Sequence, residues 1–401
     1  MKNFIFQNTT KLVFGKGQIA LLSSLVPKDK KIMVTYGGGS VKKNGIYEQV
    51  VNALKEHKYI EFWGIEPNPT VETLRKAIAI GKEKKIDFLL SVGGGSVLDG
   101  TKLIAAGILY EGDAWEIVLN GKADISIPFA SVMTLPATGS EMNCGSVISR
   151  SETKEKYAFY NQYPEFSILD PEVTFSLPQH QIANGLVDTY VHVIEQYMTT
   201  PGQSRIMDRW AEGILLTIIE LAGKIWESQQ DYDTMADFML SATLALNDFI
   251  RMGVSQDWTT HMIGHELTAL HGVDHGASLA IVLCGTLRVL KDQKRGKLLQ
   301  YGERIFSITE GSEDERIDLA ISKTEDFFKS IGVGNCDCCC QSSFPEEYSN
   351  SVVMKTRLSE VGIGDETIEI IAERFNSKGT LLGENRNVTG DIVRQILLSC
   401  K

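Results

Sequence analysis

The chain has 401 residues, of which 43% are hydrophobic and 23% are charged, and its formal net charge is −11. This composition excludes a collagen, a disordered chain and a low-complexity scaffold, and it supplies apolar side chains for a core in each of two or three domains. The acidic balance excludes general binding of nucleic-acid backbones, which are themselves anionic. No apolar stretch approaches about 18 residues, so we expect neither a membrane span nor a membrane partner.

The N-terminal segment, MKNFIFQNTTKLVFGKG, alternates polar and apolar residues and lacks the apolar core of a signal peptide. We therefore expect a cytoplasmic protein. The chain has 7 cysteines, an odd number, and they are unevenly spaced. A disulfide framework would distribute its cysteines, so this pattern favours reduced thiols.

In chain order, an apolar run at 31–36 ends in Gly-Gly-Gly-Ser and leads into a helical pattern. A second run, at 88–92, ends in the same four residues and leads into a helical pattern that ends near Ala106. The segment 70–85 between them predicts an amphipathic helix, and 129–134 predicts a further strand. Strands that alternate with helices predict a parallel sheet wrapped by helices.

The pattern changes near Asp170-Pro171, where strand-like runs become rare. Long helical patterns follow at about 181–221, 233–252 and 257–270. We therefore expect an α/β domain over 1–174 and an all-helical domain over 175–401, with a ligand site in the cleft that such a pair commonly forms.

The two glycine loops indicate a nucleotide. A glycine loop between a strand and a helix lets backbone N–H groups approach an anion at the positive helix end. One such loop is equally well explained as a tight turn, but two copies after successive strands favour a dinucleotide. The first loop has no carboxylate, which would select NAD at the ribose 2′-hydroxyl. It is followed by Lys42 and Lys43, of which at least one is expected only to be a solvated helix start, and we predict NADP(H) over NAD(H).

Four of the seven histidines lie within fifteen residues, at 261, 265, 271 and 275. A fifth, His192, is four residues after Asp188, so the two share a helical face. His261 and His265 have the same spacing. A carboxylate with three imidazoles suits one divalent ion, Fe(II) or Zn(II), better than Mg or Ca. The spacing alone leaves open which three histidines bind.

Six stretches carry a resemblance to a known family: YGGGSVKKNGIY (36–47), GIEPNPTVETL (64–74), SVGGGSVLDGTKLIAA (91–106), TLPATGSEMN (134–143), ANGLVDTYVHVIEQYMT (183–199) and DWTTHMIGHELTALHGVDH (257–275). The sequence resembles the group III, or iron-containing, alcohol dehydrogenases, most closely their butanol dehydrogenase and NADPH-dependent aldehyde reductase branch. The resemblance implies a Rossmann-like domain followed by a helical metal-binding domain, the fold shared with dehydroquinate synthase, usually as a homodimer or a larger homo-oligomer.

The resemblance also implies roles for particular residues. The metal ligands would be Asp188, His192, His261 and His275. His265 would lie beside the nicotinamide and the substrate and relay a proton, which leaves His271 as a structural histidine. The cofactor contacts would be Gly37, Gly38 and Ser40 near the adenosine ribose, Asn68, then Gly94, Gly95, Ser96 and Asp99 at the pyrophosphate and the neighbouring ribose, and Thr134, Thr138, Ser140 and Lys156.

The reaction implied is metal-assisted hydride transfer between NADP(H) and a short- or medium-chain alcohol or aldehyde. The alternative on the same fold is a dehydroquinate synthase-like lyase, which needs several basic residues to hold its anionic substrate. The basic residues of 181–275 do not adjoin the histidines in the sequence, so we favour the oxidoreductase.

One segment departs from the family pattern. About twenty residues are inserted after 327–332, and four cysteines fall within them, Cys336, Cys338, Cys339 and Cys340. These thiols could form a second metal site, but adjacent cysteines do not easily converge on one ion. We expect an exposed insertion with no part in the chemistry.

Overall fold

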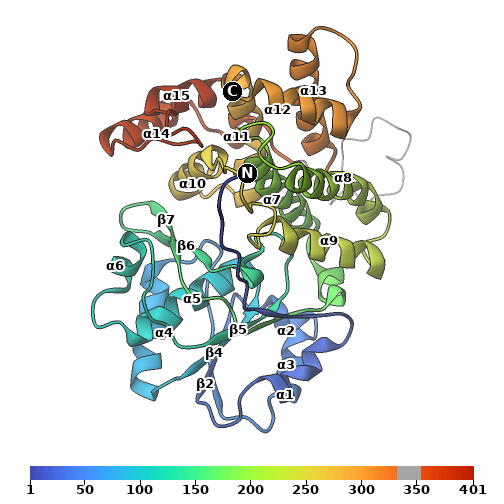
Figure 1. Ribbon diagram of the computed structural model, residues 1–401. Helices are drawn as coiled ribbons and strands as arrows, with labels where there is room; N and C mark the ends of the chain where they lie inside the picture. The colour runs from blue at the N-terminus through green and yellow to red at the C-terminus, as the bar shows by residue number, and fades with distance from the viewer. Residues whose placement is uncertain (332–353) are drawn as a thin grey trace. The chain divides into compact units, whose positions relative to one another are not determined.

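The computed structural model describes residues 1–331 and 354–401 (Figure 1). The predicted insertion with Cys336–Cys340 lies outside the described residues. Two compact units are present. The sheet unit comprises Gln7–Leu177 and Gln229–Asn247, and the helical unit comprises Met1–Phe6, Pro178–Ser228 and Asp248–Lys401.

The sheet unit contains a six-stranded parallel sheet in the order β1-β8-β5-β4-β2-β3. The strands are β1 Lys11–Phe14, β2 Ile32–Tyr36, β3 Tyr59–Phe62, β4 Phe88–Gly93, β5 Phe129–Met133 and β8 Phe166–Leu169. Every residue of β2, β4 and β5 is buried, because these strands are central and helices cover both faces. The strand order reverses between β2 and β4, where ligands of such sheets bind at the carboxyl ends.

The helices of the sheet unit are α1 Leu22–Leu25, α2 Ser40–Lys43, α3 Ile46–Ala53, α4 Val71–Lys84, α5 Gly95–Leu109, α6 Ala114–Leu119 and α9 Tyr232–Ala245. Figure 1 shows α4 and α5 on one side of the sheet and α2 and α3 on the other, as right-handed crossovers require. The predicted helix over 70–85 is α4, which Thr70 caps by accepting a hydrogen bond from the Thr73 backbone N–H.

Five strands of the sheet unit were not predicted. β1, β3 and β8 belong to the parallel sheet, while β6 Gly145–Arg150 and β7 Glu155–Tyr160 form an antiparallel hairpin. The hairpin strands are only partly buried and mix polar with apolar residues, so they lack the continuous apolar runs that mark β2 and β4.

The helical unit consists of α7 Gln179–Tyr197, α8 Arg205–Glu227, α10 Thr259–His271, α11 His275–Val289, α12 Lys291–Phe306, α13 Glu313–Ser330, α14 Asp365–Ser377 and α15 Gly390–Leu398. The largely buried α11 packs against α7, α10, α13 and α15. A parallel α/β part and an all-helical part confirm the predicted fold class. No helix in the described ranges is long and apolar enough to cross a membrane.

The helix ends and the division into units differ from the predictions. The pattern over 181–221 forms two helices, α7 and α8, because Pro201-Gly202 interrupts it, and Gly202 has a φ of 74°. The pattern over 233–252 ends at Ala245. The predicted boundary at 174 divides the chain once, whereas the structure assigns Gln229–Asn247 to the sheet unit and Met1–Phe6 to the helical unit.

Candidate metal centre and nucleotide loops

Helix α7 presents three functional groups on one buried face. Asp188, His192 and Glu195 follow one another at spacings of four and three residues, which place side chains on the same side of a helix. All three are buried. The face therefore carries two carboxylates and one imidazole without contact with bulk water.

Helices α10 and α11 supply the remaining histidines. His261 lies in the first turn of α10, His265 one turn later, and His275 is the first residue of α11. A Cβ at Gly276 would lie 2.5 Å from the backbone oxygen of Asn184, so only glycine lets α11 begin this close to α7. This close approach brings His275 to the face of α7.

The histidines converge on one oxygen of Asp188. Asp188 Oδ1 lies 3.4 Å from His192 Nε2, 3.6 Å from His261 Nε2 and 3.6 Å from His275 Nε2. One ligand atom from each of Asp188, His261 and His275 lies within 4.8 Å of the other two. The rings of His192 and His261 stack with their centroids 4.6 Å apart.

The carboxylates of Asp188 and Glu195 stabilise positively charged groups in this cluster. Burial by itself raises the pKa of Asp188, but the imidazoles of His192, His275 and His261 outweigh burial and bring this pKa below its ordinary value. Burial disfavours the charged form of His261, yet Glu195 and Asp188 raise its pKa to about 9. The site therefore favours a proton or a metal cation.

The donor atoms fit a metal ion. Asp188 Oδ1 and His261 Nε2 are buried without a hydrogen-bond partner among the described residues, an arrangement that is costly unless another group binds them. Ligands held about 2.0–2.2 Å from one tetrahedral ion lie about 3.3–3.6 Å apart. The Asp188–histidine distances have this spacing, and one carboxylate with imidazoles is a donor set for Fe(II) or Zn(II).

The other two histidines of the cluster differ in their surroundings. His265 is buried, and its ring centroid lies 5.4 Å from that of His275. His271 Nε2 is 2.9 Å from Thr367 Oγ1 in α14, a contact that suits the structural role expected for it. Glu195 was not predicted, although its spacing of three residues from His192 was a signal that could have found it.

The two glycine loops lie at the carboxyl ends of β2 and β4, where the strand order reverses. Gly37 and Gly38 follow β2, and Gly94 follows β4, its neighbour in the sheet. A Cβ at Gly95 would lie 2.4 Å from Thr138 Oγ1, so the loop after β5 packs directly on the start of α5. Thr134 continues this edge through its backbone N–H, which donates to the oxygen of Gly93 at 3.0 Å.

Three predicted cofactor residues contact one another. Ser96 Oγ accepts a hydrogen bond of 3.3 Å from the Asn68 backbone N–H. Asn68 Oδ1 accepts one of 2.8 Å from Lys156 Nζ. Asn68 has a φ of 55°, in the left-handed region that asparagine tolerates better than most residues. The structure thus brings Asn68, Ser96 and Lys156 together at the start of α5.

The carboxylate of Asp99 is engaged within the protein. Its Oδ1 accepts from Ser140 Oγ at 2.7 Å and its Oδ2 from the Val147 backbone N–H at 2.9 Å. The ammonium of Lys102, also buried, donates to Ser140 Oγ at 2.8 Å and to Gly145 O at 2.6 Å. Asp99 and Lys102 therefore fasten the segment 140–147 to α5.

Lys42 is held by aromatic rings. Its ammonium lies 3.9 Å from the ring centroid of Trp63 and 5.3 Å from that of Tyr47, a cation–π arrangement. Ser40 is the first residue of the short helix α2, and Gly39 precedes it with a φ of 99°. No residue of 37–43 has a carboxylate side chain.

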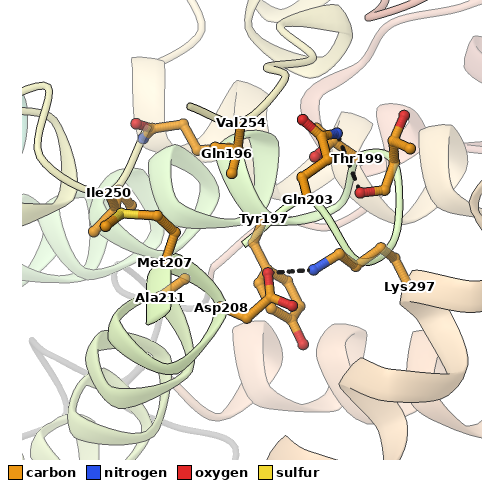
Figure 2. A pocket seen from close by; sticks show the side chains of 11 residues that line it. Gln196, Tyr197, Thr199, Gln203, Met207, Asp208, Ala211, Ile250, Val254 and Lys297 are labelled. Atoms are coloured by element: carbon orange, nitrogen blue, oxygen red, sulfur yellow. Dashed lines mark hydrogen bonds and ion pairs between the residues drawn. The ribbon is translucent and has the colours of Figure 1, made fainter. Parts of the chain in front are cut away.

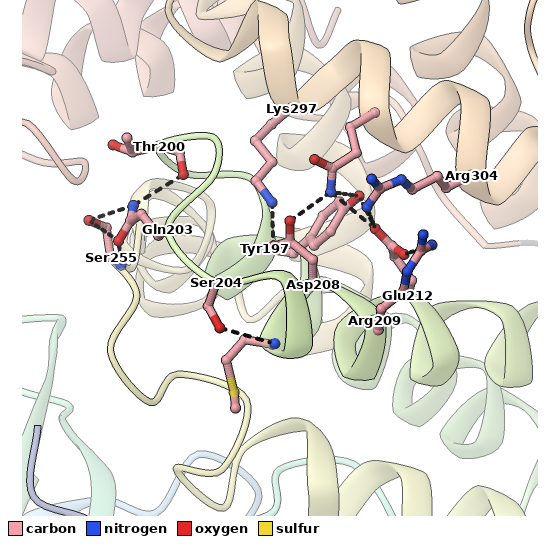
Figure 3. Close-up of polar contacts among 12 residues, drawn as sticks. Tyr197, Thr200, Gln203, Ser204, Asp208, Arg209, Glu212, Ser255, Lys297 and Arg304 are labelled. Atoms are coloured by element: carbon pink, nitrogen blue, oxygen red, sulfur yellow. Dashed lines mark hydrogen bonds and ion pairs between the residues drawn. The ribbon is translucent and has the colours of Figure 1, made fainter. Parts of the chain in front are cut away.

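A polar network fixes the carboxyl end of α7, the helix that carries Asp188. Figure 2 shows Lys297 directed at Asp208 beside a small cavity at this end of the helix. Lys297 Nζ donates to Asp208 at 2.5 Å and lies 4.2 Å from the Tyr197 ring centroid. Figure 3 shows Arg304 and Glu212 extending the network, with a contact of 2.7 Å between them. These groups pair with one another, so the network supports α7 and adds no ligand group to the metal cluster.

Comparison with known proteins identifies the family. Residues 9–171 match "Iron-containing alcohol dehydrogenase", and residues 182–335 match the C-terminal part of the Fe-containing alcohol dehydrogenase family. The NADPH-dependent aldehyde reductase YqhD of Escherichia coli K12 is 48% identical over 403 residues, covering 99% of each chain. A probable NADH-dependent butanol dehydrogenase of Bacillus subtilis is 39% identical, with 99% of each chain covered.

A crystal structure of E. coli K-12 YqhD superposes with a TM-score of 0.93 at 47% identity, covering 100% of this chain and 99% of that one. Both matching families belong to the dehydrogenases, which decides between the two predicted reactions in favour of the oxidoreductase. The chain belongs to the iron-containing alcohol dehydrogenase family and is an oxidoreductase of the alcohol dehydrogenase and aldehyde reductase class.

Proposed function

We propose that this enzyme reduces short- and medium-chain aldehydes to alcohols with NADPH and one divalent metal ion, Fe(II) or Zn(II). The convergence of three histidine Nε2 atoms on Asp188 Oδ1 carries the proposal, since two of these four atoms are buried without a hydrogen-bond partner in the described chain. Aldehyde reduction consumes one NADPH and one proton, and the reverse reaction oxidises the alcohol.

The metal ligands in this proposal are Asp188, His192, His261 and His275. When bound, the ion supplies Lewis-acid chemistry that polarises the carbonyl group of the substrate. The burial of Asp188 and His192 keeps water from competing for their donor atoms. His265, which is buried and has its ring 5.4 Å from that of His275, is proposed to hold the proton exchanged with the alcohol hydroxyl on a ring nitrogen.

The cofactor residues in this proposal are those expected from the resemblance. The loops after β2 and β4 would bind the phosphates, because glycine backbone N–H groups and the amino end of α5 attract anions at the reversal of strand order. The residues proposed to contact the cofactor are Gly37, Gly38, Ser40, Asn68, Gly94, Gly95, Ser96, Asp99, Thr134, Thr138, Ser140 and Lys156.

The choice of NADPH over NADH rests on the loop after β2. No carboxylate occurs within 37–43, so no negative charge there repels a 2′-phosphate, and the Ser40 hydroxyl supplies a hydrogen-bond donor. The relatives include both kinds of enzyme, and the NADPH-dependent reductase is more similar to this chain, at 48% identity, than the probable NADH-dependent dehydrogenase, at 39%.

The proposal is tested by following NADPH oxidation with a panel of straight-chain aldehydes, with metal analysis of the same preparation. We expect turnover with butanal, loss of turnover after chelation and recovery on adding Fe(II) or Zn(II). A metal-loaded protein that oxidises NADPH with none of the aldehydes would refute the proposed substrate class. A cytoplasmic location and a homodimer or larger homo-oligomer stay predictions of the sequence.

A further inference from the structure

Glu195 is a buried carboxylate that the proposed function leaves without a task. Its side chain contacts the beginning of α10 through both oxygens. Oε2 is hydrogen-bonded to His261 Nδ1, and Oε1 accepts from the Thr260 backbone N–H at 2.6 Å. Glu195 is 4% exposed, so water does not compete for these contacts.

The contact with Glu195 determines how the His261 imidazole can be used. A carboxylate oxygen only accepts hydrogen bonds, so the ring proton of His261 is required on Nδ1. In the neutral ring, which is the form that binds a metal, Nε2 then carries the lone pair, and Nε2 is the atom that lies 3.6 Å from Asp188 Oδ1. A proton on Nε2 would leave Glu195 facing a second acceptor and would remove the lone pair from the cluster.

We infer that Glu195 is a positioning residue that holds His261 in the tautomer and orientation needed to bind a divalent metal through Nε2. The inference rests on the metal centre of the proposed function. A carboxylate behind a ligating imidazole also makes the ring a stronger donor. With Asp188, Glu195 brings two negative charges to neutral imidazoles, which matches the charge of one divalent ion.

The backbone near Glu195 is fixed by a separate ion pair. The Asp257 backbone N–H donates to the Glu195 backbone oxygen at 2.8 Å, which ties the entry to α10 to the end of α7. Lys294 Nζ pairs with Asp257 Oδ2 at 2.8 Å and donates to Met198 O at 2.9 Å. Lys294 therefore pairs with Asp257, and the Glu195 carboxylate keeps His261 as its charged or polar side-chain partner.

The test compares Glu195→Gln with Glu325→Gln. Glu325 is a matched control because it is also buried, 5% exposed, lies in the same unit and contacts Arg288, Lys329 and Arg357 instead of the histidines. Zn²⁺ affinity is measured by competition with a chromophoric chelator, and the visible spectrum is recorded after loading with Co²⁺.

We expect Glu195→Gln to weaken Zn²⁺ binding by about 10–100-fold and to change the Co²⁺ spectrum. Glu325→Gln should keep both, even where it lowers the melting temperature. An unchanged affinity and an unchanged spectrum in Glu195→Gln would overturn the inference. A wild-type protein that binds no Zn²⁺ would instead refute the metal centre of the proposed function.

A second measurement needs no variant at position 195. In Zn²⁺-loaded wild-type protein labelled with ¹⁵N-histidine, the ring nitrogens of His261 report which of them carries the proton, and His261→Gln identifies the signals. We expect the proton on Nδ1. A proton on Nε2 would overturn the inference, even if Glu195→Gln did not fold.

Discussion

His265 and His275 lie with their ring centroids 5.4 Å apart, but the proposal gives them different tasks. His275→Ala removes an Nε2 atom from the group around Asp188, so we expect it to lose most bound metal and nearly all turnover. His265→Ala should keep its metal and lose about 10²–10⁴-fold in rate, the range for a proton-transfer group. Metal content and turnover of both variants are measured on protein with an unchanged circular dichroism spectrum. Equal metal loss in the two variants would show that the ligands are wrongly assigned.

Gly38 is the position at which cofactor choice can be tested without backbone strain. A Cβ there meets no atom within 4 Å, and its φ lies outside the left-handed region, whereas Gly39 has a φ of 99°. We expect Gly38→Asp to lower the preference for NADPH, measured as kcat/KM with NADPH divided by kcat/KM with NADH, by tenfold or more. The new carboxylate would repel the 2′-phosphate of NADPH and accept a hydrogen bond from the 2′-hydroxyl of NADH, and such a charge-assisted hydrogen bond contributes about 1.5–3 kcal/mol.

The matched control for this prediction is Gly38→Asn, which adds nearly the same volume without the charge. Its ratio of kcat/KM for NADPH and NADH should stay close to that of the wild type. If aspartate and asparagine alter the ratio equally, the loop after β2 does not contact the 2′ position of the ribose.

The sequence indicated the candidate metal ligands, but it did not indicate Glu195, which contacts one of them. Asp188 and His192 share a helical face by spacing alone, and the resemblance selected His261 and His275 from the remaining histidines. Glu195 was not predicted because a lone glutamate in a helix usually lies at the surface, and only the packing of α10 against α7 brings it to His261.

At the scale of elements, the strands with continuous apolar runs were predictable and the others were not. β2, β4 and β5 are fully buried, and each predicted end lies within one residue of the observed one. β1 is an edge strand of four residues, and none of them is fully buried. Its pairing with β8 joins residues 11–14 to 166–169, a long-range contact that no local pattern reveals.

Lys102 connects α5 to the segment after β5, and its loss should destabilise the fold. Its ammonium donates to the backbone oxygens of Ser140, Asn143 and Gly145 at 2.8, 3.0 and 2.6 Å. Lys102→Met removes the charged donor that these backbone oxygens share and takes away a cation that lowers the pKa of the buried Asp99. We expect a loss of about 3–5 kcal/mol in the free energy of unfolding, measured by denaturant titration.

The control for this element is Lys76→Met, since Lys76 lies on the exposed side of α4. Its effect should remain within about 0.5 kcal/mol. Equal stability of the two variants would mean that Lys102 does not fasten the segment 140–147 to α5.

At the scale of the whole molecule, the sequence predicted an α/β unit followed by a helical unit, but it did not predict the exact boundaries of the two units. The predicted change at 174 lies near Leu177, where the first long segment of the sheet unit ends. The return of Gln229–Asn247 to that unit depends on contacts such as Gln229 Nε2 with the oxygen of Leu177 at 2.9 Å. Helical periodicity predicts α9, but it does not show which core α9 completes.

The number of metal ions per chain tests whether the molecule has one metal site. Adjacent cysteines do not easily direct their sulfur atoms at one ion, whereas Asp188, His261 and His275 place ligand atoms within 4.8 Å of one another. We therefore expect one metal equivalent per chain, held by the helical unit. Replacing Cys336, Cys338, Cys339 and Cys340 together by serine should leave both the metal content and the aldehyde turnover unchanged. His275→Ala serves as the positive control, because the same metal analysis should record its loss. If the serine variant lost one equivalent while His275→Ala retained one, the thiols would form a second site and the chemistry would have to be divided between two ions.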